Sequence, residues 1–262
     1  MPPCPPIRAW SKPISGPDMP EDVKAQTLLP EPILGVENLE GWYGEGQVLH
    51  GVTFDVRPGQ VVTLLGRNGA GKTTTLRALM GILGKRRGSI RFDGVQTIAL
   101  PSRRIARLGL GYVPEERGIF ASLSTFENLM LPPRVKPGGL GVEQIYTLFP
   151  NLRERAGSPG TKLSGGEQQM LAIGRILPTG ARTILLDEPT EGLAPVIVQQ
   201  IGRTIAQLKQ DGYTIVLVEQ NFRFAQTVAD KHVVIEQGRT VDTIANADFE
   251  ASLGKITTYL GV

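Results

Sequence analysis

A glycine-rich run early in the chain has the composition of a loop that binds phosphate groups. Glycines let the backbone turn its N–H groups toward an anion without obstruction from side chains. Within the run, Lys72 can reach the β and γ oxygens of a nucleoside triphosphate, and the hydroxyl of Thr73 can ligate Mg²⁺. The run therefore predicts nucleotide binding by Gly66, Arg67, Asn68, Gly69, Ala70, Gly71, Lys72, Thr73 and Thr74.

Two carboxylates, Asp187 and Glu188, end an apolar run farther along the chain. If that run is a buried strand, Asp187 emerges at the carboxyl edge of the sheet, where phosphate-loop folds bind ligands. We expect Asp187 to hold Mg²⁺ through the water around the ion, and Glu188 to orient and deprotonate the attacking water. Acidic pairs at strand ends are common by themselves, but Pro189 and the apolar residues before the pair favour the catalytic interpretation.

A third run, Ser164-Gly165-Gly166-Glu167, lies between the phosphate loop and the carboxylates. Ser164 can cap a helix predicted from Gly165 to Leu177, but a cap does not explain two glycines that each cost a helix about 1 kcal/mol. Glycines are favourable there if a phosphate must approach the backbone closely. In this order of motifs the run cannot reach the nucleotide of its own chain, so we expect these four residues to bind ATP held by a second chain.

Apolar patterns predict the elements that position these residues. Val61–Leu65 is a continuous apolar run, typical of a strand buried on both faces, and it leads into the phosphate loop and a helix. Further strands are predicted over 33–39, 52–56, 89–92, 183–187 and 214–218, with helices over 72–83 and after Pro195 and a hairpin over 233–242. Residues from about 97 to 178 are predicted to be mostly helical and to form a sub-lobe. Strands alternating with helices predict an α/β sheet.

Composition sets the broad class of the protein. The 262 residues suffice for one large domain, and a net charge of +3 gives no reason to expect nucleic-acid binding. The single cysteine, Cys4, permits no internal disulfide, and no apolar stretch approaches the roughly 18 residues that a membrane span needs. Residues 1–32 hold nine of the twenty prolines and are expected to form a disordered extension before the domain at 33–262.

Together, the phosphate loop, the Ser-Gly-Gly run and the carboxylate pair resemble the ATP-binding cassette (ABC) family in order and spacing, from about Ile33 to Val262. The resemblance implies a phosphate-loop NTPase with a RecA-like lobe, an antiparallel β subdomain and an α-helical subdomain, which hydrolyses ATP with Mg²⁺. It further implies that Tyr43 stacks on adenine, with a buried tyrosine as the alternative. The loop 191–195 would communicate across a dimer, and Pro114-Glu115 would lie where two lobes meet.

Two positions depart from most of the family. Glu115 stands where most members have glutamine, and Gln220 where most have histidine. At both positions the chain resembles the ATPases of branched-chain amino-acid importers and their urea- and amide-importing relatives. Gln220 can donate to the γ-phosphate but cannot carry charge, whereas an ionised Glu115 can only accept and is expected to hold a water on Mg²⁺.

The resemblance implies the ATPase subunit of an importer, bound peripherally on the cytoplasmic side of the inner or plasma membrane. Its partners would be a second ABC ATPase, identical or different, two transmembrane permease subunits and, indirectly, a periplasmic or extracellular substrate-binding protein. Branched-chain amino acids are the expected substrate, with urea or short amides as the alternative. A soluble ABC ATPase without a transport role is the remaining possibility. We expect His50 and His232 to be structural, because neither has a metal-ligand pattern around it.

Overall fold

The computed structural model describes residues 30–261. The disordered extension predicted over 1–32 therefore falls outside the described residues except for 30–32, which belong to no helix or strand. The strands are β1 (Leu34–Tyr43), β2 (Gly46–Val56), β3 (Val61–Leu65), β4 (Lys85–Phe92), β5 (Val95–Gln96), β6 (Leu110–Val113), β7 (Thr183–Asp187), β8 (Thr214–Glu219), β9 (Lys231–Glu236) and β10 (Arg239–Ala245). The α-helices are α1 (Lys72–Leu79), α2 (Ser102–Arg107), α3 (Thr125–Met130), α4 (Val142–Leu148), α5 (Pro150–Glu154), α6 (Gly165–Gly174), α7 (Pro195–Gln210), α8 (Phe222–Val228) and α9 (Leu253–Leu260).

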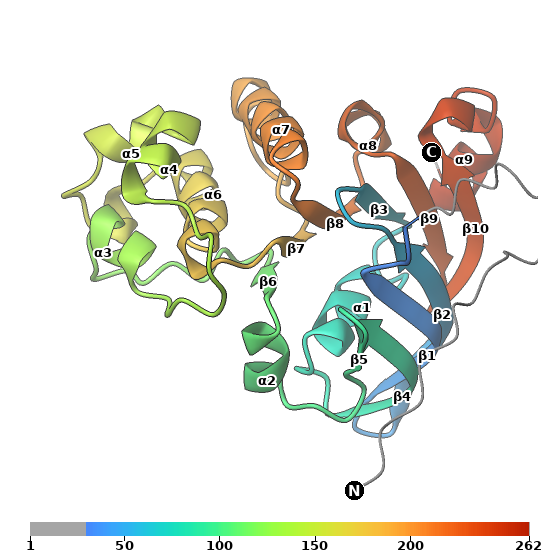
Figure 1. Cartoon of the computed structure of the whole chain (residues 1–262). Helices are drawn as coiled ribbons and strands as arrows, with labels where there is room; N and C mark the ends of the chain where they lie inside the picture. The colour runs from blue at the N-terminus through green and yellow to red at the C-terminus, as the bar shows by residue number, and fades with distance from the viewer. Residues whose placement is uncertain (1–29, 262) are drawn as a thin grey trace, which may run out of the picture. The chain divides into compact units, whose positions relative to one another are not determined.

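The central sheet has six strands in the order β10-β9-β3-β8-β7-β6 (Figure 1). All neighbours are parallel except the β9–β10 hairpin, so the carboxyl ends of β3, β7 and β8 meet at one edge of the sheet. Both faces are covered, because Val62 and Leu64 pack in one hydrophobic cluster while Val61 and Leu65 pack in others. Continuous apolar strands are what two buried faces require, so the prediction made from Val61–Leu65 is confirmed.

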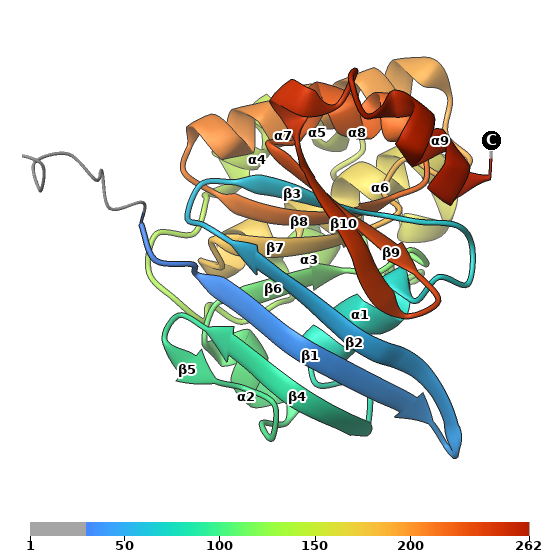
Figure 2. The same cartoon turned by 90° about the vertical axis from the view of Figure 1, so that its right-hand side faces the viewer.

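A second sheet, antiparallel and in the order β2-β1-β4-β5, shares a hydrophobic core with α1 and one face of the central sheet (Figure 2). Helices α7 and α8 cover the opposite face, where Ile201, Ile205 and Leu208 of α7 are buried. Ile197, one turn earlier on the same apolar face of the helix predicted after Pro195, is only partly buried. The α/β class and the antiparallel β subdomain are therefore as expected.

Helices α3 to α6 share part of the second hydrophobic cluster and form the helical region (Figure 1). The range 97–178, predicted to be mostly helical, also contains β6, which pairs with β7 and is an edge strand of the central sheet. A four-residue strand with a glycine at its second position has too few apolar residues to be recognised by pattern. No helix in the part of the chain that the structure describes has the length and apolarity that a membrane crossing needs.

Candidate nucleotide-binding site

The phosphate loop joins β3 to α1 and is supported by the β9–β10 hairpin. The backbone N–H of Gly238, in the hairpin turn, donates to the carbonyl of Ala70 at 2.8 Å. Gly71 occupies the position before α1 with φ of 105°, a left-handed conformation that side chains disfavour. No side chain caps α1, so the first N–H groups of the helix remain available to a ligand.

A cavity of about 330 Å³ opens above this loop. Nine of the residues predicted from sequence line it, namely Asn68, Gly69, Gly71, Lys72, Thr73, Thr74, Glu115, Glu188 and Gln220. Two lining residues, Val48 and Glu191, were not assigned to the site from the sequence. Residues far apart in the chain thus converge at the carboxyl edge of the sheet, where the motif order predicted a nucleotide site.

Lys72 is almost fully buried and is held by its own loop. Its ammonium donates to the carbonyls of Gly66 at 2.8 Å and Arg67 at 3.2 Å. The same ammonium lies 3.5 Å from a carboxylate oxygen of Glu188. Lys72 is therefore fixed at the floor of the cavity with its charge beside the predicted catalytic base.

Asp187 ends β7, is fully buried and accepts two hydrogen bonds. The hydroxyl of Thr73 donates to one carboxylate oxygen at 2.9 Å, and the hydroxyl of Tyr112 donates to the other at 3.0 Å. Burial raises the pKa of Asp187 above its usual value, although both hydrogen bonds act in the opposite direction. Tyr112 gave no signal in the sequence, because its role depends on β6 pairing beside β7.

The arrangement of Thr73 and Asp187 fits a Mg²⁺ ion that is shared with a bound triphosphate. Within residues 30–261 there is no group of three His, Cys, Asp or Glu side chains that could hold a metal alone. An ion at this site would accordingly need phosphate oxygens and water to complete its coordination. That is the usual mode for Mg²⁺ in phosphate-loop proteins.

Glu188 turns away from the direction of β7. Its φ of 45° is in the left-handed region, where residues other than glycine are uncommon and where strain often marks a functional position. The side-chain amide of Gln220 donates to Glu188 at 2.6 Å. Burial opposes ionisation of Glu188, but hydrogen bonds with Glu191 and Gln220 and the charge of Lys72 outweigh it, so its pKa is lowered.

Glu191 belongs to the same cavity and forms a coupled pair with Glu188. Its hydrogen bond with Glu188, together with burial and the repulsion between the two carboxylates, raises the pKa of Glu191 to about 7. Near neutral pH, Glu188 is therefore ionised, and Glu191 is the carboxylate that takes up a proton first as the pH falls. A carboxylate three residues after a predicted base was the sequence signal that could have identified it.

The Ser164–Glu167 run starts α6 and lies outside the cavity lining. Ser164 and Glu167 form a reciprocal cap, in which the hydroxyl of Ser164 accepts from the N–H of Glu167 at 3.3 Å and the Glu167 carboxylate accepts from the N–H of Ser164 at 2.7 Å. The predicted cap is confirmed. Tyr43, at the end of β1, also lies outside the lining and is 48% exposed, which rules out the buried alternative.

Close approach of a phosphate was the reason inferred for both glycines of this run, and the structure adds a second reason for Gly166. A Cβ on Gly166 would lie 2.9 Å from a methyl carbon of Ile197 on α7, so packing within the chain already requires glycine there. Gly165 is less restricted, because a Cβ would meet only the guanidinium of Arg117 at 3.3 Å and Leu193 at 3.6 Å. Only Gly165 is left without a packing reason.

The model of the ABC transporter family matches residues 49–191, more than half of the chain. The chain is 43% identical over 218 residues to the high-affinity branched-chain amino acid transport ATP-binding protein BraG of Pseudomonas aeruginosa, covering 80% of this chain and 91% of BraG. This chain belongs to the ABC transporter family. It is an ATPase of that family, as the resemblance implied, and ABC ATPases bind nucleotide and act as dimers with transmembrane components.

Other members of the family are also similar to this ABC ATPase. The lipopolysaccharide export protein LptB of Escherichia coli K12 is 35% identical over 214 residues, covering 79% of this chain and 88% of LptB. A solved ATP-binding subunit of an ABC transporter aligns with a TM-score of 0.72 at 28% identity, covering 85% of this chain and 93% of that subunit. A dimeric ATP-binding cassette bound to ADP and Pi aligns with a TM-score of 0.71 at 22% identity, covering 81% and 98%, and shows the shared fold.

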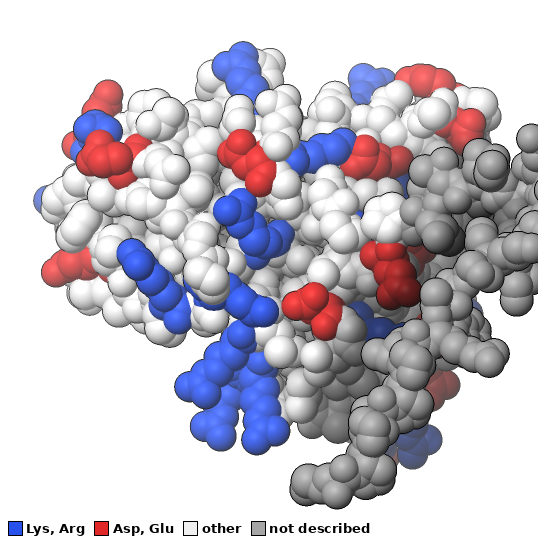
Figure 3. All heavy atoms as spheres, in the orientation of Figure 1, with Lys and Arg blue, Asp and Glu red and all other residues white. Residues whose placement is uncertain are grey.

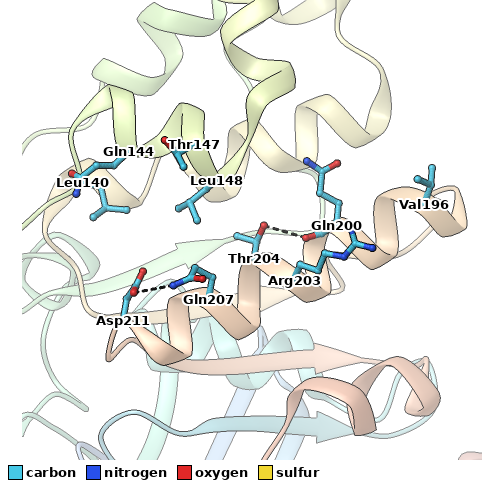
Figure 4. Close-up of a pocket in the computed structure, with 10 residues that line it drawn as sticks. All are labelled: Leu140, Gln144, Thr147, Leu148, Val196, Gln200, Arg203, Thr204, Gln207 and Asp211. Atoms are coloured by element: carbon cyan, nitrogen blue, oxygen red, sulfur yellow. Dashed lines mark hydrogen bonds between the residues drawn. The ribbon is translucent and has the colours of Figure 1, made fainter.

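A second cavity of this ABC ATPase is larger than the nucleotide cavity. It measures about 610 Å³ and lies between α4 and α7 (Figure 4). Its lining contains Gln144 and Thr147 of α4 and Gln200, Arg203 and Gln207 of α7, but none of the predicted site residues. Since residues of the phosphate loop line the smaller cavity together with Glu115 and Glu188, chemistry rather than size identifies the nucleotide site.

Proposed function

We propose that this ABC ATPase drives the import of branched-chain amino acids. The similarity to BraG carries the proposal, because it extends over nearly the full length of that relative. Glu115 and Gln220, which resemble the importer subgroup, also lie together in the nucleotide cavity. Import of urea or short amides is the second candidate, because the same two residues resemble those relatives equally well.

Within the site, we assign the phosphates to the loop and to the free N–H groups at the start of α1. Lys72 would bind the β and γ oxygens, Thr73 and Asp187 would hold Mg²⁺, and Glu115 would accept a hydrogen bond from a water on the ion. Mg²⁺ supplies charge that offsets the negative charge developing on the transferred phosphoryl group. Asp187 lies within hydrogen-bonding distance of Thr73 and shares the loop's edge of the sheet, which supports this assignment.

Hydrolysis is assigned to Glu188 as the base that removes a proton from the attacking water. Its pKa is lowered, so the carboxylate is ionised and able to accept a proton at neutral pH. Gln220 orients Glu188 through the 2.6 Å hydrogen bond and has a second amide hydrogen for the γ-phosphate. Tyr43 is assigned to adenine, since its exposed ring at the end of β1 is available for stacking.

The N–H groups at the start of α6 are assigned to the γ-phosphate of a second cassette. The run from Ser164 to Glu167 is absent from the lining of its own chain's cavity, and Ser164 and Gly165 are not buried. A helix start offers N–H donors and a positive dipole end, both of which suit a phosphate. The two assignments together give an ATP bound between two chains, of the same or different sequence.

Docking to membrane subunits is assigned to a surface that begins at α3. Phe126, Met130 and Leu131 are 45% to 48% exposed and form the largest run of exposed apolar side chains near the helical region. Exposed apolar residues clustered in this way commonly mark protein interfaces. Phe120, five residues after Glu115 in the chain, is also exposed, at 48%.

An arginine cluster consists of Arg103, Arg104 and Arg107 on α2 with Arg134, which follows α3 in the chain. Figure 3 shows Lys and Arg side chains gathered over α2. All four arginines are exposed, and among residues 30–261 none of them forms an ion pair. Arg103, Arg107 and Arg134 line one shallow hollow without an acidic neighbour. We propose that this arginine cluster binds acidic residues on the cytoplasmic loops of the permease subunits.

Uptake of radiolabelled leucine by cells that lack this gene tests the transport role. We expect uptake to fall and to be restored by the wild-type gene but not by Glu188→Gln. Parallel uptake of urea and acetamide separates the second candidate. Unchanged uptake of all three compounds, together with purification of the ATPase free of any membrane protein, would contradict an importer role.

A further inference from the structure

The end of β8 is tied to residues 188–190 by three hydrogen bonds. The backbone N–H of Glu188 donates to the carbonyl of Val218 at 3.0 Å, and the Gln220 amide donates to the Glu188 carboxylate at 2.6 Å. Between them, the hydroxyl of Thr190 donates to the carboxylate of Glu219 at 2.7 Å. The first two bonds involve the predicted base directly, whereas the third lies behind it.

Glu219 is a buried carboxylate that the proposed reaction does not use. It is 2% exposed, and Thr190 is 7% exposed. Gln220 lines the nucleotide cavity and Glu219 does not. Burying an acidic side chain is costly unless it is hydrogen-bonded, and burial raises the pKa of Glu219 to about 7. Burying an apolar side chain at this position would cost less free energy than burying a carboxyl group. The presence of the carboxyl group therefore requires another explanation.

Thr190 lies in the loop that connects Asp187 and Glu188 to α7. The N–H of Leu193 donates to the carbonyl of Thr190 at 3.3 Å, and the N–H of Glu191 donates to that of Glu188 at 3.3 Å. Leu193 in turn approaches Gly165 at the start of α6. A shift of Thr190 would therefore move the catalytic carboxylate on one side and the contact with α6 on the other.

We propose that Glu219 is a positioning residue for hydrolysis, which holds Thr190 and thereby fixes Glu188 and the 190–193 loop against Gln220. The inference rests on the proposed role of Glu188 as the base. Glu219 does not line the nucleotide cavity and acts through its hydrogen bond with Thr190, besides one with the backbone of Asn221 next to Gln220. The fixed geometry matters because a base must be held within about 3 Å of the proton it removes.

The test compares Thr190→Val, Thr190→Ser, Glu219→Gln and Glu219→Ala in the full chain by steady-state ATP hydrolysis. Valine has nearly the shape of threonine but no hydroxyl, so we expect Thr190→Val to lower kcat about tenfold and to change KM for ATP less than twofold. Thr190→Ser and Glu219→Gln retain a donor and an acceptor respectively, so both should keep more than about half of the wild-type kcat. Glu219→Ala should match Thr190→Val if it folds.

A double-mutant cycle separates this inference from the role of Glu188. If Glu219 acts through Glu188, then Thr190→Val should lower kcat no further in a Glu188→Gln background. Thr190→Val with wild-type kcat, or equal losses in both backgrounds, would overturn the positioning role. Wild-type hydrolysis by Glu188→Gln alone would instead overturn the proposed base. Melting temperatures of all variants by circular dichroism show whether a kcat loss merely follows unfolding.

Discussion

Two helices of this ABC ATPase begin at glycine-containing runs, and their starts are built differently. Helix α1 begins at Gly71 without a side-chain cap and is surrounded by Lys72, Asp187 and Glu188. Helix α6 is closed by the reciprocal Ser164–Glu167 cap and has no such charged groups from the cavity around it. The first start has the chemistry for hydrolysis in its own chain, whereas the second has donors to offer to a phosphate held elsewhere but no catalytic carboxylate.

The difference shows that similar glycine patterns have different causes. At α1 the glycine before the helix adopts a conformation that side chains disfavour. At α6 the second glycine allows α7 to pack closely, whereas packing within the chain gives no reason for the first. The following changes test whether this division of roles is correct.

The largest effect is expected at the α1 site, from Glu188→Gln. Loss of the base should lower kcat at least about 100-fold, as removal of a general base commonly does, while ATP still binds. Steady-state hydrolysis and binding of a fluorescent ATP analogue measure the two properties. Glu116→Gln, an exposed carboxylate outside the cavity, is the matched control and should hydrolyse ATP normally. Normal turnover by Glu188→Gln would remove Glu188 as the base.

At the start of α6, Gly165→Ala should lower ATP hydrolysis roughly tenfold, or about 1.4 kcal/mol in the activation free energy, because a methyl group would obstruct a phosphate from the partner. The stability of the chain should hardly change, since a Cβ there meets a flexible guanidinium. Urea unfolding and hydrolysis assays measure both quantities. A variant that hydrolyses ATP at the wild-type rate would show that no phosphate approaches Gly165.

Gly166→Ala should show the opposite pattern in stability. A Cβ at 2.9 Å from Ile197 overpacks the contact between α6 and α7, so we expect a loss of about 1–3 kcal/mol in the free energy of unfolding. Adding Ile197→Ala should recover part of that loss. If Gly166→Ala is as stable as Gly165→Ala in the same urea titration, then packing does not explain this glycine.

The smallest effect concerns pH. The hydrogen bond with Glu188 raises the pKa of Glu191 to about 7. Glu191 is therefore protonated below pH 7, and above pH 7 it adds a negative charge to the cavity. KM for ATP should therefore rise a few-fold between pH 6 and pH 8. In Glu191→Gln, which cannot ionise, the rise in KM between the same two pH values should be smaller. Identical pH profiles for the two proteins would contradict the coupled pair.

Much of the fold was predictable, because its strands are continuous apolar runs between turns. The strand at 61–65, the strand ending at Asp187 and the hairpin around Gln237-Gly238 all appear near their predicted bounds. The short strand β6 was missed, since it is recognised only by its pairing with β7. Local pattern thus predicts long buried elements and misses a short edge strand.

The site residues that belong to a sequence motif were predictable. The residues that act through contacts between distant segments of the chain were less predictable. The phosphate loop, Glu115, Glu188 and Gln220 do share one cavity. Tyr112 and Glu219 were not found, because each acts through a hydrogen bond to a residue on another strand or loop. Sequence spacing along one segment gives no measure of such contacts.

The central claim is that ATP is shared between the phosphate loop of one chain and the start of α6 in another. Light scattering of Glu188→Gln with Mg²⁺ and saturating ATP tests it most directly. The account predicts the mass of two chains with ATP, the mass of one chain without it, and one chain again when Ser164→Arg is added to block α6. A single chain at saturating ATP, or a dimer that persists with Ser164→Arg, would contradict it.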